Sequence, residues 1–244
     1  MMLLQNKTAL VIGGGTGIGS GVALALAEAG CKVIISGRRE EPLRQVASRC
    51  NIEGAIQCRT ADIADREGIH QLVDWATEQL GQIDILVNCA GVNVPKRTMA
   101  ELAPEDWDKL MNINATGAYN AMHAVLPQMR ERKDGLIINV SSIAGVRASL
   151  LGGVAYSASK FAMTALGTCV GLEERNNGIR VTNVYPGEVE TPILDARPVP
   201  VSQEHRSRIL QPEDIASLVV TIAALPPRAH VPDIVIKPTT QEFC

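Results

Sequence analysis

Short aliphatic runs alternate with longer stretches of mixed polarity from one end of the chain to the other. The short runs are bounded by glycine and polar residues and predict buried strands, whereas the longer stretches repeat apolar residues three or four positions apart and predict helices. Strands are expected at residues 8–12, 32–36, 55–59, 83–88, 136–141, 179–185 and 234–237, and helices at residues 18–29, 41–50, 65–80, 104–132, 154–175 and 212–225.

This alternation predicts an α/β fold, because strands separated by helices pair in parallel through βαβ crossovers. We expect a single doubly wound, Rossmann-type domain over residues 1–244, with a seven-stranded parallel sheet and helices on both faces. Residues 187–210 carry three prolines and follow neither pattern. Since a long irregular segment in a compact domain usually serves function, this segment is expected to be a substrate-binding loop within the domain.

The composition indicates an aliphatic core, because apolar residues make up 46% of the chain and aromatic residues only 3%. A net charge of −3 argues against a nucleic-acid or anionic membrane partner. The six cysteines are scattered, without a CxxC pair or a histidine cluster, so neither a metal site nor a disulfide framework is expected. No apolar run reaches membrane length, and the N-terminus lacks a signal-peptide pattern. We therefore expect a cytoplasmic protein.

Tyr156 and Lys160 lie four positions apart in the helix expected at residues 154–175, so both side chains fall on one face, about one turn apart. An ammonium beside a phenol favours the phenolate and lowers a pKa that is normally about 10. Such a tyrosine can act as a general acid or base near neutral pH. The same spacing arises by chance in many helices, where it marks only a half-buried aromatic residue with a solvated neighbour.

Glycines fill the turn between the first expected strand and the first expected helix. Glycine there lets main-chain N–H groups approach a pyrophosphate at the positive end of a helix. The spacing is Gly-x-x-x-Gly-x-Gly rather than the usual Gly-x-Gly-x-x-Gly, and a glycine-rich turn alone is a weak indication. Its place at the start of a βαβ series favours dinucleotide binding by Gly13, Gly15, Thr16, Gly17, Ile18 and Gly19.

Two arginines, Arg38 and Arg39, follow the second expected strand, where NAD enzymes place an acidic residue on the ribose hydroxyls. Arginine pairs well with a 2′-phosphate. NADP(H) is therefore the expected cofactor, with NAD as the alternative. In the competing interpretation the two arginines are solvated and pair with Glu40 or Glu41.

Together these residues resemble the short-chain dehydrogenase/reductase family along essentially the whole chain. Besides the glycine loop, the resemblance rests on elements that occur in the family's order. They are Asp62-Ile63, Asn88-Cys89-Ala90-Gly91, Asn114, Ser142, Tyr156 with Lys160, and Pro186-Gly187 with Val189 and Thr191. The resemblance implies cofactor contacts for Asp62 and Ile63 at the adenine, for Asn88, Ala90 and Gly91, and for Pro186, Gly187, Val189 and Thr191 at the nicotinamide.

The resemblance also implies reversible hydride transfer between the nicotinamide and a carbonyl or secondary alcohol. Tyr156 would exchange the proton, and Ser142 would hydrogen-bond the reacting oxygen, with Ser141 as a neighbouring alternative that the family's register disfavours. Lys160 would hold the nicotinamide ribose and lower the pKa of the tyrosine. Asn114 would hold a water that connects Lys160 with solvent.

Family resemblance further implies a homo-oligomer, either a tetramer or a dimer. The helices that begin at Pro104 and Val154 would meet a neighbouring subunit, and residues 243–244 are in a position to reach one.

The chain departs from the family pattern at Ile12 and Cys89, where threonine and asparagine are usual and are expected to hydrogen-bond across neighbouring strands. Both replacements prefer apolar contact, so neither leaves a polar partner unsatisfied. We therefore expect the side chains of Ile12 and Cys89 to contact each other in place of that bond.

The C-terminal part is similar to the NADP-dependent branch that oxidises serine, allo-threonine and other 3-hydroxy acids, and to related carbonyl reductases. A small carbonyl or alcohol compound is the expected substrate, with a small 3-hydroxy acid as the candidate. A 3-oxoacyl-acyl-carrier-protein-type reductase and a catalytically silent dinucleotide-binding sensor or scaffold are the alternatives. Candidate lining residues are 92–94, 149–153 and 188–194; Arg147 and Arg197 are either carboxylate partners or surface charges, and His230 is expected to be a loop residue.

Overall fold

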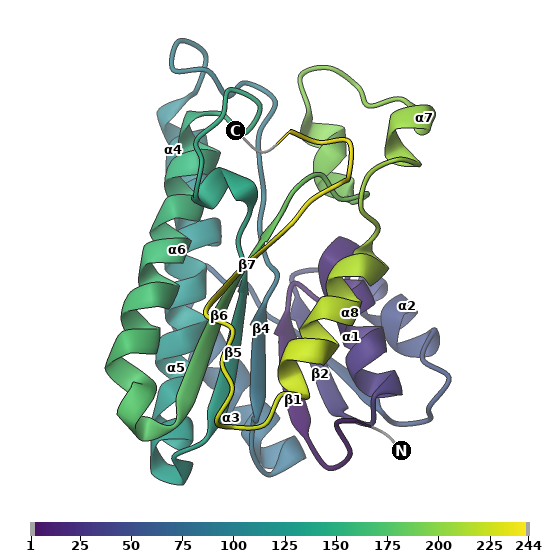
Figure 1. The fold of residues 1–244 in the computed structure, drawn as a ribbon, viewed down its shortest axis with the longest axis vertical. Helices are drawn as coiled ribbons and strands as arrows, with labels where there is room; N and C mark the ends of the chain where they lie inside the picture. Colours follow the sequence, from purple (N-terminus) through teal and green to yellow (C-terminus); the bar gives the residue numbers. More distant parts are fainter. Residues whose placement is uncertain (1–2, 243–244) are drawn as a thin grey trace.

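Seven strands form one sheet in the computed structural model, which describes residues 3–242 (Figure 1). The order is β3-β2-β1-β4-β5-β6-β7, and every neighbouring pair is parallel. The strands are β1 Thr8–Ile12, β2 Lys32–Gly37, β3 Ile56–Thr60, β4 Ile85–Asn88, β5 Gly135–Val140, β6 Ile179–Pro186 and β7 Asp233–Ile236. The predicted seven-stranded, doubly wound sheet is confirmed.

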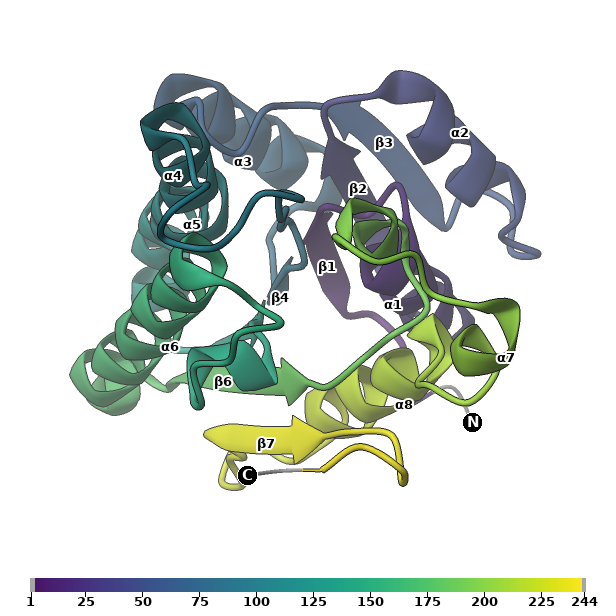
Figure 2. The same ribbon diagram turned by 90° about the horizontal axis from the view of Figure 1, so that it is seen from above.

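Helices cover both faces of this sheet (Figure 2). One face packs against α1 Gly17–Glu28, α2 Glu40–Ser48 and α8 Pro212–Ala223, and the other against α3 Arg66–Leu80, α5 Gly117–Arg132 and α6 Val154–Glu174. Each face has its own aliphatic core. Burial on both sides explains why the strands are continuous apolar runs rather than alternating ones.

The helical pattern predicted at residues 104–132 is interrupted in the structure. It consists of α4 Pro104–Met111, a π-helical turn at Asn112–Thr116 and then α5. A π turn spaces its hydrogen bonds one residue wider than an α turn and often occurs at functional sites. Because the apolar spacing continues through the turn, the sequence pattern did not reveal it. All other predicted elements lie within two residues of the observed bounds.

Residues 187–210 are less irregular than predicted. They contain a 3-10 turn at Pro192–Ala196 and the short helix α7 at Gln203–Arg206, which Figure 1 shows beyond the ends of the strands. Arg206 joins the two pieces, because it donates to Glu190 and to Asp195, each at 2.7 Å. Two further 3-10 turns lie at Ile143–Gly145 and Arg175–Asn177.

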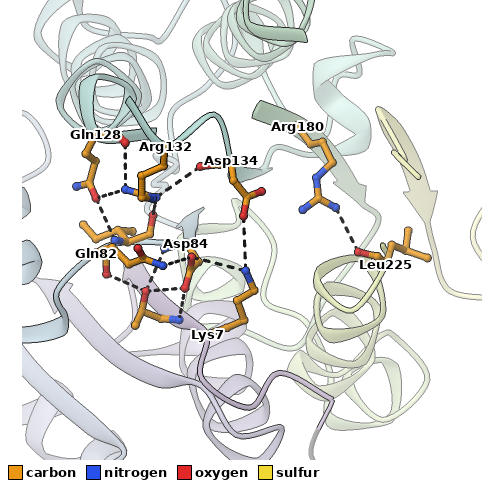
Figure 3. A network of polar contacts seen from close by, with 10 residues as sticks. Lys7, Gln82, Asp84, Gln128, Arg132, Asp134, Arg180 and Leu225 are labelled. Carbon is orange, nitrogen blue, oxygen red and sulfur yellow. Dashed lines mark hydrogen bonds and ion pairs between the residues drawn. The ribbon is translucent and has the colours of Figure 1, made fainter. Parts of the chain in front are cut away.

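A polar network joins the amino ends of three strands at the opposite end of the sheet (Figure 3). The carboxylate of Asp84, only 5% exposed, accepts from the main-chain N–H of Thr8 at 2.9 Å. The ammonium of Lys7 lies 3.7 Å from Asp84 and 3.6 Å from Asp134. Arg132 donates to the main-chain oxygen of Ile83 at 2.9 Å. This network ties together the starts of β1, β4 and β5, and leaves the carboxyl ends of the strands free to form a site.

Candidate active site

A cleft of about 520 Å³ opens at the carboxyl ends of β1 and β4. The chain leaves these neighbouring strands in opposite directions along the sheet, and such a switch point is where doubly wound folds bind ligands. Most of the predicted site residues line this one cleft. They are Gly13, Gly15, Thr16, Gly17, Ile18, Gly19, Arg38, Arg39, Asp62, Ile63, Ala90, Gly91, Ser142, Tyr156, Lys160, Pro186, Gly187, Val189 and Thr191.

The glycine loop is built so that side chains are excluded from it. A Cβ on Gly19 would lie 2.1 Å from the main-chain oxygen of Gly13, and Gly17 has a φ of +53° with a Cβ position 2.9 Å from Thr191. The N-cap residue of α1, Thr16, makes no side-chain capping bond, and the first turn of α1 holds no acidic residue. The N–H groups at the helix start are thus open to an anion, which fits the pyrophosphate of a dinucleotide.

Arg38 and Arg39 lie directly after β2, are exposed and line the cleft. The acidic residues that could have paired with these arginines bind other side chains. Glu40 pairs with Arg44 at 2.6 Å, and Glu41 accepts from Gln45 at 2.9 Å. Within residues 3–242 neither Arg38 nor Arg39 takes part in an ion pair. Their position suits a 2′-phosphate.

Asn88 was predicted at the cofactor, but its side chain does not line the cleft. It is buried within the sheet and donates to Asn139 at 2.9 Å, and Asn139 donates in turn to Asn183 at 3.3 Å. These residues are register partners on β4, β5 and β6, so their amides form a row across three strands. Asn88 therefore lies beneath the cleft, whereas Ala90 and Gly91 line it.

The predicted side-chain contact between Ile12 and Cys89 is wrong. Their main chains are joined, because the N–H of Cys89 donates to the oxygen of Ile12 at 2.8 Å. The side chain of Ile12, however, belongs to the core on the α3 and α5 side, whereas Cys89 packs against the core on the α1 side. Side chains along a strand point alternately to the two faces of a sheet, and the side chains of Ile12 and Cys89 therefore lie on opposite faces.

Tyr156 and Lys160 lie on the first turns of α6, and Ser142 follows the end of β5. The hydroxyl of Ser142 is close enough to the phenol of Tyr156 to lower its pKa by hydrogen bonding, and it also accepts from the N–H of Ala144 at 3.1 Å. Ser141 instead donates to the main-chain oxygen of Lys160 at 3.2 Å. Ser142 is therefore the serine that faces the tyrosine, as the family's register predicted.

The electrostatics of Tyr156 differ from the prediction. Burial raises the pKa of the phenol, and Ser142 and then Arg97 oppose this shift. The ammonium of Lys160 points to Val140, donating to its main-chain oxygen at 3.0 Å, and lies 5.8 Å from the centre of the Tyr156 ring. Burial lowers the pKa of Lys160 itself to about 8. Arg97, rather than Lys160, is the charged residue that lowers the pKa of Tyr156 against the effect of burial.

Sequence reasoning missed Arg97. The residue lies in the loop after β4, where no periodicity or motif marks it, yet it is only 6% exposed and lines the cleft. The one feature of the sequence that could have pointed to Arg97 is its positive charge close to the Asn-Cys-Ala-Gly element.

Asn114 occupies the π turn and is fully buried. Its amide accepts from the N–H of Val92 at 2.8 Å and donates to the oxygen of Val92 at 3.0 Å, and it also donates to Ser159 at 3.0 Å. A Cβ on Gly91 would lie 3.3 Å from Nζ of Lys160 and 3.7 Å from Oδ1 of Asn114. Lys160 and Asn114 thus both lie beside Gly91, and the water that Asn114 was expected to hold stays a prediction.

The substrate side of the cleft is bordered by segments from all three predicted groups. They include Val92, Asn93, Ser149, Leu151, Gly152, Glu188, Ile193 and Leu194, whereas Val94 and Glu190 do not line the cleft. Arg197 is not the surface charge of the simpler interpretation, because it is largely buried and pairs with Glu188 at 3.0 Å. Arg147 is exposed and lies outside the cleft lining. His230 contacts the main-chain oxygen of Val181 at 2.9 Å from a loop.

Residues 3–242 contain no group of three or more histidine, cysteine or acidic residues arranged to hold a metal ion. No helix in this part of the chain has the length and apolar character needed to cross a membrane.

Comparison with known proteins agrees with this geometry. Residues 7–199 match the family described as short chain dehydrogenase, and the chain belongs to this family. An uncharacterised oxidoreductase of Staphylococcus saprophyticus is 33% identical over 240 residues, which cover 98% of this chain and 100% of that protein. The prediction of an NAD(P)-dependent oxidoreductase that acts on CH–OH groups is confirmed.

Two solved structures are similar over almost their full length. A serine dehydrogenase complexed with NADP+ superposes with a TM-score of 0.87 at 27% identity, covering 97% of this chain and 96% of the other. A 3-ketoacyl-(acyl-carrier-protein) reductase from Brucella melitensis complexed with NADH has a TM-score of 0.87 at 26% identity, covering 96% and 98%.

Proposed function

We propose that the protein transfers a hydride reversibly between NADP(H) and a small carbonyl or secondary alcohol compound. The observation that carries this proposal is the continuity of one cleft, which begins at the glycine loop and ends at the paired Tyr156 and Ser142. The bound nicotinamide would supply or accept the hydride. The single domain supplies the cleft, and residues 187–210 close its substrate side as a binding loop.

The residues at the catalytic end of the cleft each have a separate role in the reaction. Tyr156 gives the proton to the substrate oxygen in reduction and takes it back in oxidation. Ser142, beside the phenol, donates a hydrogen bond to the same oxygen and stabilises the charge that develops there. Lys160, which lies beside Gly91 in the cleft, binds the nicotinamide ribose, and Asn114, near the same glycine, holds a water that connects Lys160 with solvent.

Preference for NADP(H) over NAD(H) follows from Arg38 and Arg39. Both arginines line the adenosine end of the cleft and have no acidic partner among the described residues. The 2′-phosphate of NADP(H) would be an anion with which they can pair. The serine dehydrogenase complex with NADP+ supports the same assignment.

A small 3-hydroxy acid is the substrate we propose, on the likeness to the serine dehydrogenase. The reductase from Brucella melitensis supports a 3-oxoacyl-acyl-carrier-protein substrate as the second candidate. A parallel assay separates them: a panel of 3-hydroxy acids, a 3-oxoacyl thioester and simple ketones, each with NADP(H) and NAD(H). Turnover of a 3-hydroxy acid with NADP+ supports the proposal. Cofactor binding without turnover of any compound would instead identify a silent sensor or scaffold.

We further propose a cytoplasmic homo-oligomer, a tetramer or a dimer. The five cysteines within residues 3–242 are free thiols, which is typical of a reducing compartment. Trp107 on α4 and Phe161 and Leu172 on α6 are exposed, and apolar side chains on these helices suit a contact with a second copy. The predicted role of residues 243–244 falls outside the described residues. Sedimentation of the purified protein tests the oligomeric state.

A further inference from the structure

Arg97 holds together the three loops that surround the substrate side of the cleft. Its Nε donates to the oxygen of Val94 at 2.9 Å within the loop after β4. Its two terminal nitrogens reach across the site, to the oxygen of Leu151 in the loop before α6 at 2.7 Å and to the oxygen of Ala196 in the loop after β6 at 2.5 Å. One guanidinium thus fixes main-chain groups from three separate segments, as its rigid array of donors allows.

The same residue is packed against the start of the helix that carries Tyr156. The main-chain oxygen of Arg97 accepts from the N–H of Val154, the first residue of α6, at 3.1 Å. Gly153 before it has a φ of +81°, and a Cβ there would lie only 2.5 Å from Cβ of Arg97. The position of Tyr156 therefore depends on the loop that contains Arg97.

Arg97 forms no ion pair with any of residues 3–242. The charged and titratable groups around it and Tyr156 are Lys160 and Cys89 on the strand side and Arg197 on the loop side. Glu188 already pairs with Arg197 at 3.0 Å and with His205 at 2.6 Å. Among the described residues, the guanidinium of Arg97 is thus held by carbonyl oxygens and not by a carboxylate, in the cleft that Tyr156 also lines.

We propose that Arg97 is a positioning residue for proton transfer, which fixes the three loops and the start of α6 around Tyr156 and holds a positive charge in the same cleft as the phenol. This role rests on the proposed function, and it adds a second cation to the site besides Lys160. The charge of Arg97 lowers the pKa of Tyr156 and so opposes the effect of burial.

Three variants test this role: Arg97→Gln, Arg97→Lys, and Lys96→Gln as a control that removes the adjacent, exposed charge. The first readout is phenolate absorbance of the protein without cofactor as a function of pH, with Tyr156→Phe subtracted to isolate one of the three tyrosines. Arg97→Gln is expected to raise the apparent pKa of Tyr156, because a cation that favours the phenolate is removed. Arg97→Lys keeps the charge and should titrate like the wild type, as should Lys96→Gln.

Kinetics give the second readout. Arg97→Gln should lower kcat for alcohol oxidation near neutral pH several-fold, because the loops around Tyr156 lose their fixed positions and the phenolate fraction falls. Arg97→Lys should retain kcat but raise KM several-fold, since one ammonium cannot bind three carbonyl groups in fixed directions.

An unchanged titration of Tyr156 in folded Arg97→Gln would overturn the proposal. If Arg97→Gln does not fold, the test depends on Arg97→Lys. A raised pKa of Tyr156 in Arg97→Lys, which keeps the positive charge, would also contradict the proposal. The titration needs no substrate, so a wild-type protein without turnover would refute the proposed function and leave this test intact.

Discussion

The ammonium of Lys160 donates to the main-chain oxygen of Val140 at 3.0 Å, which attaches the active-site helix to the last residue of β5. Val140 lies two positions before Ser142, so this bond also fixes the distance between the serine segment and α6. Lys160 is thus held by the protein before any cofactor enters, and its charge is buried without a carboxylate partner.

The buried charge of Lys160 predicts a pH-dependent stability. Its pKa falls from 10.5 in the unfolded chain to about 8 in the fold. Between these values the unfolded state binds more protons, so the destabilisation by Lys160 is complete below about pH 8 and disappears as the pH rises to about 10.5. Urea unfolding should show the stability of Lys160→Met relative to wild type decreasing by about 3 kcal/mol over this range. A difference that does not vary with pH would contradict the buried, charged lysine.

Arg38→Ala should weaken NADPH binding roughly tenfold or more, because a lost phosphate pair removes about 1.4 kcal/mol or more. NADH affinity should change little. Arg44→Ala is the matched control, since Arg44 is close in sequence but pairs with Glu40 on α2. Fluorescence titration with both cofactors measures the two affinities, and equal losses for NADPH and NADH would remove the argument for NADP(H).

Gly19→Ala should abolish dinucleotide binding, because its Cβ would meet the oxygen of Gly13 at 2.1 Å and distort the loop. Gly171→Ala on α6 is the control, as its Cβ would make an ordinary contact with Val181 at 3.4 Å. Circular dichroism checks the fold, and calorimetry measures binding. Normal cofactor affinity in Gly19→Ala would show that the loop does not approach the pyrophosphate.

Asp84→Ala should destabilise the fold by about 1–3 kcal/mol, because it leaves the buried N–H of Thr8 without its acceptor, whereas the Thr8 hydroxyl keeps the oxygen of Gln82. Asp134→Ala should change stability by less than about 1 kcal/mol, since its pair with Lys7 is 41% exposed on the aspartate side. Denaturant unfolding of both variants measures the difference. Equal effects would mean that the network in Figure 3 does not depend on its buried member.

The parts of the site that depend on local sequence could be predicted. The glycine loop, the arginines after β2 and the four-residue spacing of Tyr156 and Lys160 each follow from one strand or helix and its ends. The family's register also favoured Ser142 over Ser141, and the lowering effect of the Ser142 side chain on the pKa of Tyr156 agrees with that choice.

The parts that depend on three-dimensional contacts could not be predicted. Arg97 matters because it meets segments 54 and 99 positions away, and no local pattern records such contacts. Asn88 and Cys89 are adjacent in sequence but face opposite sides of the sheet, which the motif does not distinguish. The direction of the Lys160 ammonium depends on the end of β5, and spacing along the helix specifies only the side of the helix.

The most direct test of the proposed chemistry compares Tyr156→Phe with the wild type for NADPH-dependent carbonyl reduction, with cofactor affinity measured in parallel. The variant loses only the phenol oxygen, so NADPH affinity should stay within about twofold while kcat falls by roughly 10²–10⁴-fold. A Tyr156→Phe protein that binds NADPH normally and reduces the substrate at a rate near that of the wild type would contradict the assignment of Tyr156 as the proton donor.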